Sequence, residues 1–331
     1  MDSIKVAIFS VAHVHTHTYV NCLLANNKAE IIGIYDDNFD RVKPYTEKFG
    51  IKYYSNCNEL LEQKPHFALV CSENALHQQL TLAAAAKKVD VLCEKPLGIT
   101  KASMAEMLKA CSINGVKLMT TFPNRYVHSF LNAKRAVEEG RIGKLIGIKA
   151  TNKGSMPGGW FVKPELSGGG SVIDHTVHVA DLVNWLLGCV PDSVYAVCAN
   201  RLYDGISVDD VSFVNFKYPN GVFVSLDSSW SRSAAFPYGR DLTMNIIGTE
   251  GSIFIDYFAE KNQVFSNEKS KAEWSYYGED KDMMMINDVI MSYEAGYDFM
   301  ISGQDGYNSA IVALAAYCSI REGREVLISE I

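Results

Sequence analysis

The sequence lacks several patterns that would assign a chain to a specialised class of protein. It has no stretch approaching the roughly 20 consecutive apolar residues that a membrane helix needs. It has no dense run of Lys and Arg, and its net charge is −7 from 31 basic and 38 acidic residues. Its 24 glycines and 9 prolines are far too few for a collagen-like chain. Nucleic acid and membranes are therefore not expected partners.

The cysteines also lack the spacing of a metal ribbon or a disulfide framework. There are eight, none of them in a C-x-x-C pair, at positions 22, 57, 71, 93, 111, 189, 198 and 318. Some, such as Cys71 and Cys93, lie inside apolar runs, where a free cysteine behaves as a small hydrophobic residue. The first nine residues contain no basic region followed by a long apolar stretch, so no signal peptide is expected. We therefore expect a reduced, cytoplasmic protein.

What is present is the composition of a globular protein, with 48% apolar and 21% charged residues in a chain of 331. In residues 1–122, five short apolar runs predict strands buried on both faces. They are Ile4–Phe9, Glu30–Tyr35, Phe67–Cys71, Val89–Cys93 and Val116–Thr121. Amphipathic segments alternate with these runs and predict helices. They are His13–Asn26, Asp40–Phe49, Asn58–Gln63, Ala75–Lys88 and Lys101–Asn114. This alternation predicts an α/β domain with a doubly wound parallel sheet.

The pattern changes in residues 123–331, for which we predict an α+β domain with a mostly antiparallel, open sheet. Two pairs of strands flank turn sequences typical of hairpins. The pairs are Val211–Tyr218 with Val222–Trp230, and Leu242–Ile247 with Ser252–Tyr257. The other expected elements are a strand at Leu145–Thr151 and four helices. The helices are Tyr126–Glu139, one from the Gly-rich loop to Leu187, Asp282–Ile301 and Gln304–Ile320.

The first strand is followed by a turn that lacks the glycines of the G-x-G-x-x-G dinucleotide motif. Residues 10–15 read Ser-Val-Ala-His-Val-His, with the right spacing and small residues at the first two glycine positions. The second strand ends near Asp36, where a carboxylate can accept hydrogen bonds from the ribose of a dinucleotide. A solvated acidic turn explains Asp36 equally well when that residue is viewed alone.

Three histidines close to this turn raise the question of a metal site. His13, His15 and His17 alternate along the chain, and imidazole is a common zinc ligand. In a helix, however, residues i and i+2 diverge by about 200°, and the sequence shows no acidic or cysteine ligand close by. We therefore predict no metal site, with a zinc-dependent hydrolase as an alternative that metal analysis would test.

Polar residues follow the third and fourth predicted strands, at the sheet edge where open α/β sheets bind ligands. The first group is Ser72–His77 and the second is Glu94-Lys95-Pro96. Proline restricts its own backbone and that of the preceding residue, so Lys95 is expected to be held rigidly. Ion pairing at the surface is the alternative interpretation of the second group.

The strongest signal in the second half is a run of three glycines followed by an aspartate and a histidine. Gly168-Gly169-Gly170 allows close approach to the backbone. Asp174 and His178 are four residues apart, so they lie on one face of the predicted helix. Histidine is the usual proton-transfer group near neutral pH. A buried, purely structural Asp–His pair is the equally weighted alternative.

As an ordered set, these motifs resemble the glucose–fructose oxidoreductase / inositol dehydrogenase (Gfo/Idh/MocA) family over essentially the whole chain. The set also includes Phe122-Pro123-Asn124-Arg125, Gly140-Arg141-Ile142-Gly143 and Asp181. The resemblance implies an N-terminal Rossmann domain, and a C-terminal domain whose open sheet commonly mediates oligomerisation. It also implies oxidation or reduction of a hydroxyl or carbonyl group, on sugars or cyclic polyols, with a nicotinamide cofactor.

The resemblance also implies roles for individual residues. Lys95 would hydrogen-bond the reacting oxygen, His178 would be the general acid/base, and Asp174 would support it. Cofactor contacts would come from both Rossmann loops and from the first turn: Ser10, Ala12, His13, Val14, Asp36, Ser72, Asn74, His77, Glu94 and Lys95. Arg125 and Trp160 would be weaker candidates on the substrate side, and a cis Lys95–Pro96 peptide is expected. The chain departs from the family pattern at Ser10, Ala12, His15 and Glu73.

We therefore predict an NAD-dependent oxidoreductase of a sugar-like or polyol substrate. NAD is preferred over NADP because Asp36 and Asp37 would repel a 2′-phosphate, although Arg41 follows closely. We expect a homodimer or homotetramer formed through the C-terminal sheet. The glycine-free turn leaves open a non-catalytic relative that binds a dinucleotide or sugar as a sensor or regulatory partner.

Overall fold

The computed structural model describes residues 3–238, 241–268 and 271–331, and the chain divides into two compact units. Unit 1 comprises residues 1–123 and 281–307, and unit 2 comprises residues 124–280 and 308–331. The segment 281–307 differs from the expected division, which placed it in the second domain. It packs in unit 1 because its helix contacts the first helix of the chain, where Asn26 hydrogen-bonds Asn287 at 2.9 Å. Such a long-range contact leaves no local signal in the sequence.

Unit 1 is built on a six-stranded sheet with the order β3-β2-β1-β4-β5-β6, parallel throughout. Its strands are β1 (Ile4–Phe9), β2 (Ala29–Tyr35), β3 (Tyr53–Tyr54), β4 (Phe67–Val70), β5 (Asp90–Cys93) and β6 (Leu118–Thr120). Every residue of β4 is buried, as expected for a strand covered on both faces. The predicted doubly wound α/β domain is confirmed; only β3, a strand of two residues, was not expected.

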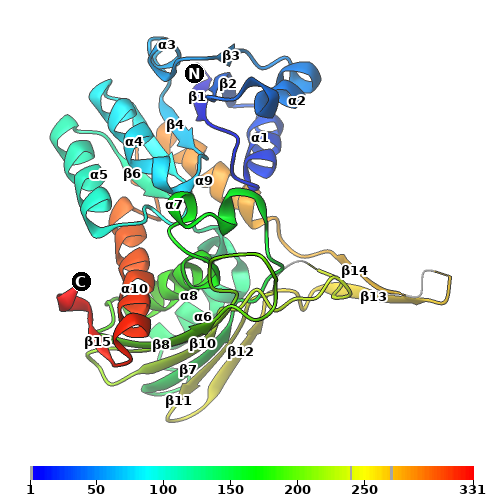
Figure 1. The fold of residues 1–331 in the computed structure, drawn as a ribbon, viewed down its shortest axis with the longest axis vertical. Helices are drawn as coiled ribbons and strands as arrows, with labels where there is room; N and C mark the ends of the chain where they lie inside the picture. The colour runs from blue at the N-terminus through cyan, green and yellow to red at the C-terminus, as the bar shows by residue number, and fades with distance from the viewer. Residues whose placement is uncertain (1–2, 239–240, 269–270) are drawn as a thin grey trace. The chain divides into compact units, whose positions relative to one another are not determined.

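Helices flank this sheet (Figure 1). They are α1 (Thr16–Ala25), α2 (Phe39–Phe49), α3 (Cys57–Leu61), α4 (His77–Ala86), α5 (Lys101–Asn114) and α9 (Lys281–Ala295). Local signals set several of their ends: the Thr100 side chain caps α5 by accepting from the Ser103 amide, and Gly115 ends it with a φ of 66°. Helix α1 starts three residues later than predicted, so His13 and His15 lie in the turn that precedes it.

Unit 2 contains a seven-stranded sheet with the order β12-β11-β7-β10-β9-β8-β15, in which only β7 and β10 pair in parallel. The strands are β7 (Leu145–Thr151), β8 (Ser193–Ala199), β9 (Val211–Lys217), β10 (Phe223–Asp227), β11 (Thr243–Gly248), β12 (Ser252–Asp256) and β15 (Val326–Leu327). Both predicted hairpins are present, and Gly221 turns the first one with a φ of 84°. A separate antiparallel pair, β13 (Lys261–Ser266) with β14 (Lys271–Tyr276), was not predicted.

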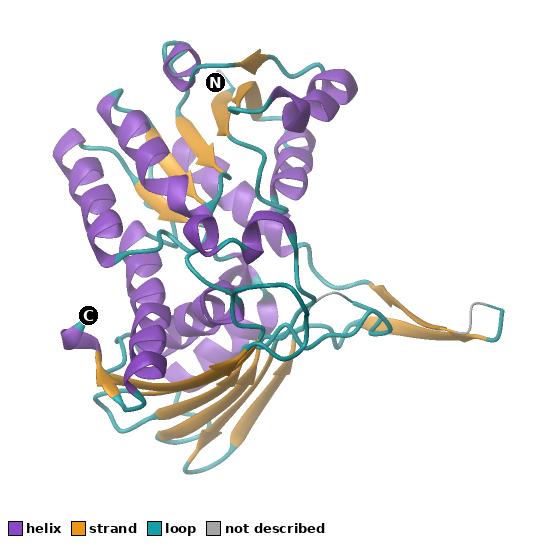
Figure 2. Cartoon of the chain, in the orientation of Figure 1, coloured by secondary structure: helices purple, strands orange, loops and turns teal. Residues whose placement is uncertain are grey.

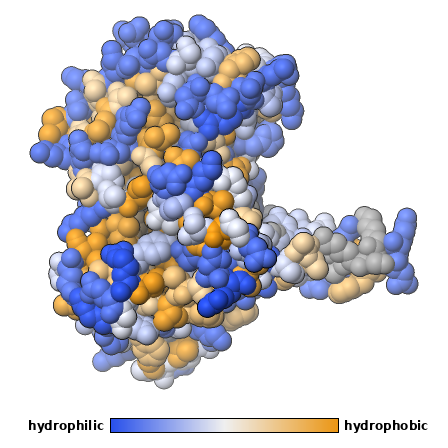
Figure 3. Space-filling view, in the orientation of Figure 1, coloured by the Kyte–Doolittle hydropathy of each residue, from blue (hydrophilic) through white to orange (hydrophobic). Residues whose placement is uncertain are grey.

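Helices cover one face of the seven-stranded sheet (Figure 2). They are α6 (His128–Glu138), α8 (Ser171–Leu187) and α10 (Gly303–Glu322), and the short helix α7 (Pro164–Ser167) precedes α8 in the chain. The strands alternate accordingly: in β9, Val214 and Phe216 are buried, whereas Phe213 is 47% exposed. Large apolar side chains lie at the surface of the opposite face, and hydrophobic residues appear over this unit in Figure 3. The predicted open, mostly antiparallel sheet is confirmed.

Two further predictions concern the chain as a whole. In the part that the structure describes, no helix combines the length and the apolar character that crossing a membrane requires. All eight cysteines are free thiols in the structure.

Candidate active site

The turn between β1 and α1 has the backbone of a glycine turn without its glycines. Ser10 takes a φ of 67°, in the left-handed region that glycine usually occupies. The Ser10 hydroxyl donates to Asp36 at 2.9 Å, and the Val11 amide donates to the same carboxylate oxygen at 2.9 Å. These bonds anchor Ser10 in an uncommon conformation. Three residues expected to contact a cofactor lie in this turn: Ser10, Ala12, which is half-buried, and Val14, which is exposed.

Asp36 lies just after β2 and is fully buried. Burial alone would raise the pKa of Asp36, but hydrogen bonds from the Val11 and Asn38 amides, Ser10 and Arg41 lower it overall. Asp36 is therefore an ionised acceptor rather than a solvated turn residue. The Arg41 guanidinium donates to Asp36 at 2.8 Å and also pairs with Asp37.

Arg41 connects the ends of two strands. Besides Asp36, it donates to Glu73 at 2.7 Å, and Glu73 follows β4. Glu73 is one of the positions at which the sequence departs from the family pattern, and in the structure it forms an ion pair with Arg41. Arg41 therefore lies directly beside Asp36, the carboxylate that is predicted to favour NAD over NADP.

The histidines of the turn lie beside a buried glutamate, although the sequence predicted that they diverge and have no acidic ligand close by. His13 and His15 precede α1, so the divergence expected within a helix does not apply, and their ring centroids are 4.6 Å apart. The Nδ1 atoms of His13 and His15 lie 3.2 and 2.5 Å from Oε1 of Glu94. The three side chains have the geometry of a potential metal site. His17 is exposed on α1, against Tyr45, and is not one of the three.

Glu94 follows β5 and is completely buried. Burial would raise the pKa of Glu94, but the neighbouring His13, His15 and Lys95 hold it well below its usual range. Its second oxygen, Oε2, accepts from the Lys95 amide at 2.5 Å and from the Thr121 hydroxyl. Glu94 thus ties the first turn to the loop that carries Lys95.

Lys95 is 3% exposed, and the Lys95–Pro96 peptide is cis, as the resemblance implied. His77 joins this peptide to the loop after β4. Its Nδ1 lies 2.9 Å from the Pro96 carbonyl oxygen, and its Nε2 lies 3.3 Å from the Ser72 carbonyl oxygen. Burial lowers the pKa of His77. Ser72 and Asn74 are also buried. The predicted cofactor residues of unit 1 therefore lie in the segments that follow β1, β2, β4 and β5, at the carboxyl ends of these parallel strands.

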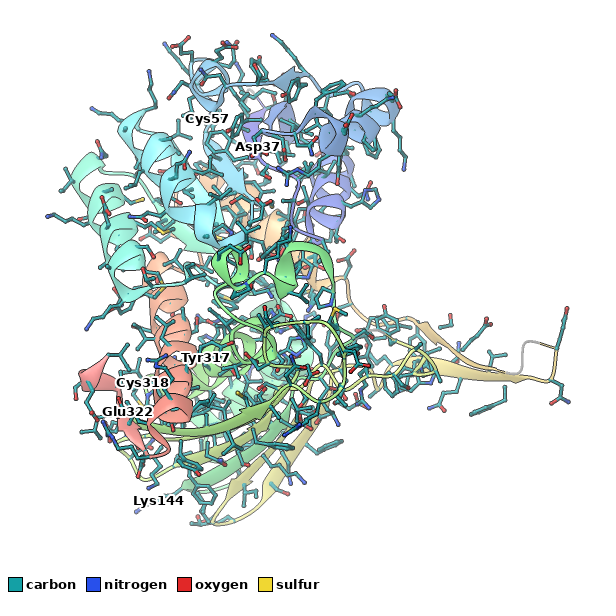
Figure 4. All side chains as sticks on the ribbon, viewed as in Figure 1. Asp37, Cys57, Lys144, Tyr317, Cys318 and Glu322 are labelled. Carbon is teal, nitrogen blue, oxygen red and sulfur yellow. The ribbon has the colours of Figure 1, made fainter. Side chains whose placement is uncertain are left out.

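In unit 2, the three-glycine loop leads directly into α8. The Gly170 amide donates to Asp209 at 3.1 Å and to the Tyr317 hydroxyl at 2.9 Å. The Val172 amide donates to the other Asp209 oxygen at 2.7 Å. Tyr317 belongs to α10 (Figure 4), and a side chain at Gly170 would collide with the Asp209 backbone. Asp209 therefore caps α8 from a different part of the chain.

Asp174 and His178 both lie in α8, one turn apart, as predicted. Asp174 is 8% exposed, and its Oδ2 accepts from the Trp230 indole at 3.0 Å. The Nε2 of His175 lies 3.3 Å from the same oxygen. His178 is half-buried. Neither His175 nor Trp230 was expected from the sequence as a partner of Asp174.

The two weaker substrate candidates have structural partners. Arg125 is 2% exposed and donates to both carboxylate oxygens of Asp181, at 2.9 and 2.7 Å. Trp160 is half-buried and stacks on Phe161 with ring centroids 3.9 Å apart. The buried ion pair with Asp181 is by itself sufficient to explain an arginine at position 125, so no contact with a substrate is needed to explain it.

The fold and these side chains define a class of protein: a Rossmann-type unit for a dinucleotide, with a second unit that carries an aspartate and a histidine on one helix face. A model of the oxidoreductase family with an NAD-binding Rossmann fold matches residues 4–122, and a model of the GFO/IDH/MocA C-terminal domain matches residues 130–254. The chain belongs to the GFO/IDH/MocA family of oxidoreductases.

Individual relatives agree with this assignment. A myo-inositol 2-dehydrogenase of Thermotoga maritima is 29% identical over 318 residues, which cover 92% of each chain. The crystal structure of a probable dehydrogenase from Thermotoga maritima superimposes with a TM-score of 0.85 at 25% identity, covering 99% of each chain. GenD2 from gentamicin A biosynthesis, solved with NAD, has the same fold, with a TM-score of 0.90 at 21% identity over 99% and 97% of the chains. These matches give the non-catalytic alternative no support.

Four residues of the two sites were missed or misjudged from sequence. His15 was read as a departure from the family pattern, although its place in the histidine run could have marked it as a partner for a carboxylate. His175 stands next to Asp174 and was the most visible omission. Trp230 and Asp209 carry no local signal, because they approach α8 from residues more than 35 positions away.

Proposed function

We propose that this protein is an NAD-dependent dehydrogenase or reductase acting on a hydroxyl or carbonyl group of a sugar or cyclic polyol. The observation that carries the proposal is that a member of this oxidoreductase family has a buried Lys95 after β5 in unit 1 and retains Asp174 and His178, one turn apart on α8, in unit 2. Free cysteines throughout suit a reducing compartment, and we propose the cytoplasm.

The residues of unit 1 suit a dinucleotide. Ser10 reproduces the glycine-like backbone of the phosphate turn, and the half-buried Ala12 stands just before α1, whose N-terminus favours anions. Asp36 is ionised and suits the hydroxyls of the adenosine ribose, which favours NAD over NADP. Bound nicotinamide would supply the hydride acceptor or donor, and the protein would supply orientation and electrostatics.

The proton chemistry would belong to the protein. In the oxidative direction, His178 takes the proton of the substrate hydroxyl while the Lys95 ammonium donates a hydrogen bond to the same oxygen. A preorganised donor of this kind stabilises developing negative charge by several kcal/mol. Asp174 supports the histidine electrostatically. In the reductive direction, His178 returns the proton.

The test is a dehydrogenase screen with inositols, hexoses and hexonic derivatives, following NADH formation after a thermal-shift comparison of NAD and NADP. We expect NAD to raise the melting temperature of the protein. We also expect the protein to reduce NAD to NADH with at least one polyol or sugar as substrate. A chain that binds neither cofactor, or that turns over none of these classes in either direction, would contradict the proposal.

A further inference from the structure

The guanidinium of Arg41 is bound by carboxylates on both of its hydrogen-bonding edges. Arg41 is the third residue of α2, just after β2. On the edge formed by Nε and Nη2, both nitrogens donate to Oδ1 of Asp36, at 3.0 and 2.8 Å. On the edge formed by Nη1 and Nη2, Nη1 donates to Glu73 at 2.7 Å and Nη2 donates to Asp37. Arginine binds a phosphate through two parallel N–H groups of one edge, and both edges are occupied here.

Glu73 differs from Asp37 as a partner of Arg41, because Glu73 is buried. Glu73 is 8% exposed, whereas the side chain of Asp37 is 67% exposed. Oε1 of Glu73 accepts from Arg41, and among the residues that the structure describes no hydrogen-bond partner reaches its Oε2. Exposed ion pairs contribute little, whereas breaking a buried pair leaves a charge without compensation. Glu73 therefore holds Arg41 more firmly than Asp37 does.

The backbone of Glu73 is itself fixed by the loop after β4. The Ser72 hydroxyl and the Leu76 amide both donate to the Glu73 carbonyl oxygen, at 3.1 and 2.9 Å. The residues that follow, Asn74–Leu76, form one short 3₁₀ turn. A partner held in this way keeps the Arg41 side chain in one position, at the end of a neighbouring strand.

We propose that Glu73 is a specificity-determining residue that disfavours NADP by holding Arg41 against Asp36. NADP sites use an arginine near the adenosine ribose to bind the 2′-phosphate. With both of its edges bound, Arg41 offers no bidentate contact to that phosphate, which would meet three carboxylates instead. Glu73 is thus a positioning residue, because it acts through Arg41. This inference rests on the proposed function, since it takes the adenosine ribose to lie beside Asp36.

The experiment measures the dissociation constants of NAD and NADP by calorimetry with the full-length protein, so it requires neither substrate nor turnover. In Glu73→Ala, Nη1 of Arg41 is released and the guanidinium can turn towards a 2′-phosphate. We expect the Kd for NADP to fall on the order of tenfold, the size of one hydrogen bond to a charged group. The Kd for NAD should stay nearly unchanged, because NAD has no 2′-phosphate.

Two further variants separate the action through Arg41 from a direct effect of the Glu73 charge. Glu73→Gln removes the charge but keeps the volume of the side chain, so it should also strengthen NADP binding, and it carries the test if Glu73→Ala does not fold. Thermal melting establishes that each variant is folded. In the double variant Arg41→Met with Glu73→Ala, the gain in NADP affinity should disappear. A direct repulsion by Glu73 would give the same gain with or without an arginine at position 41.

The matched control is Glu47→Gln. Glu47 is also a glutamate paired with a cation of α2, Lys43, at 3.8 Å, but its side chain is 66% exposed. This variant should bind both cofactors like the wild type.

The outcomes separate this inference from the proposed function. An unchanged Kd for NADP in the folded Glu73 variants, or a gain that persists without Arg41, would overturn the inference. A wild-type protein that binds NADP as tightly as NAD, or that binds neither, would overturn it as well. A protein that shows the expected changes in Kd but oxidises or reduces no sugar or polyol would contradict the proposed function alone.

Discussion

At the scale of single residues, the sites are networks in which each candidate side chain is held by named partners. Asp36 accepts hydrogen bonds from the turn after β1 and from residues that follow β2. Glu94 contacts the first turn and the loop that carries Lys95. Asp174 accepts a hydrogen bond from Trp230 and lies beside His175. Buried ionised groups need this compensation, because leaving one unpaired costs several kcal/mol. Three predictions follow from such contacts.

Replacing Lys95 with Met or His178 with Asn should lower kcat by a factor on the order of 10² to 10⁴, since each removes a group that acts on the reacting oxygen. Steady-state kinetics with the substrate found in the screen measures the effect. The exposed Lys101, changed to Met, is the control and should keep wild-type turnover. Near-normal kcat in either site variant would show that the assigned mechanism is wrong.

The Asp36→Ala variant should bind NAD more weakly and lose most of its preference over NADP. Hydrogen bonds to a charged group contribute about 1.5–3 kcal/mol, so the NAD dissociation constant should rise roughly tenfold or more. The comparison is Asp37→Ala, because Asp37 also pairs with Arg41 but its side chain is 67% exposed. Both cofactors are titrated in one buffer. Wild-type protein that binds NADP as tightly as NAD would contradict the role of Asp36.

Purified protein should contain no stoichiometric zinc at His13, His15 and Glu94. Oε1 of Glu94 already contacts His15 and accepts from Tyr19 at 3.2 Å, and Nδ1 of His13 accepts from the His15 amide at 3.2 Å. Elemental analysis of protein prepared without chelator measures this. One zinc per chain that is lost in Glu94→Gln would instead establish a metal centre and revive the hydrolase alternative.

At the scale of elements, the N-terminus of helix α8 is capped by a residue that is distant in sequence. Gly170 provides no side-chain cap, so Asp209 accepts from the Gly170 and Val172 amides and from the Ser171 hydroxyl. A carboxylate is also favoured at the positive end of the helix dipole. The element that carries Asp174 and His178 is therefore fixed at its first turn by a separate segment.

The variant Asp209→Asn should be less stable to urea by about 1–3 kcal/mol, because an amide nitrogen would face donors that the carboxylate now satisfies. Asp204→Asn, at an exposed position outside this network, is the control and should unfold like the wild type. Equal midpoints for all three proteins would mean that Asp209 does not hold the start of α8.

At the scale of the whole molecule, the uncovered face of the seven-stranded sheet carries large apolar side chains. They include Tyr195, Val197, Phe213, Phe223 and Phe254, which are 43 to 70% exposed. Apolar groups gathered on one face usually mark an interface. This supports the expectation that the chain forms a homodimer or homotetramer through that sheet.

Light scattering coupled to size exclusion should accordingly show an oligomer, and Phe213→Lys with Phe254→Lys should shift it to monomer. Ile113→Lys is the control, because Ile113 is an equally exposed apolar residue, 72% exposed, but belongs to α5 of unit 1. A wild-type monomer at micromolar concentration, or an oligomer that persists in the double variant, would show that the apolar face is not the oligomer interface.

Local sequence was sufficient to predict most of the elements and to single out candidate residues for the chemistry. The helix Lys101–Asn114 and the strand Leu145–Thr151 have the predicted bounds, because side-chain periodicity, a threonine cap and a terminal glycine all act within a few residues. Lys95, Asp174 and His178 were predicted as candidates in the same way, since their neighbours in the chain form recognisable motifs. The cis peptide and the family membership followed from those motifs.

Only the tertiary structure decided which side chains meet. Residues 281–307 join unit 1 through contacts with α1 and β5, while Ser228 and Trp230 reach α8 from more than 50 positions away. It also showed that His13 and His15 meet Glu94, about 80 positions further on. Such pairings depend on how strands and helices stack, and the free energy of that packing is spread over many distant residues. The periodicity of any one segment therefore does not record them.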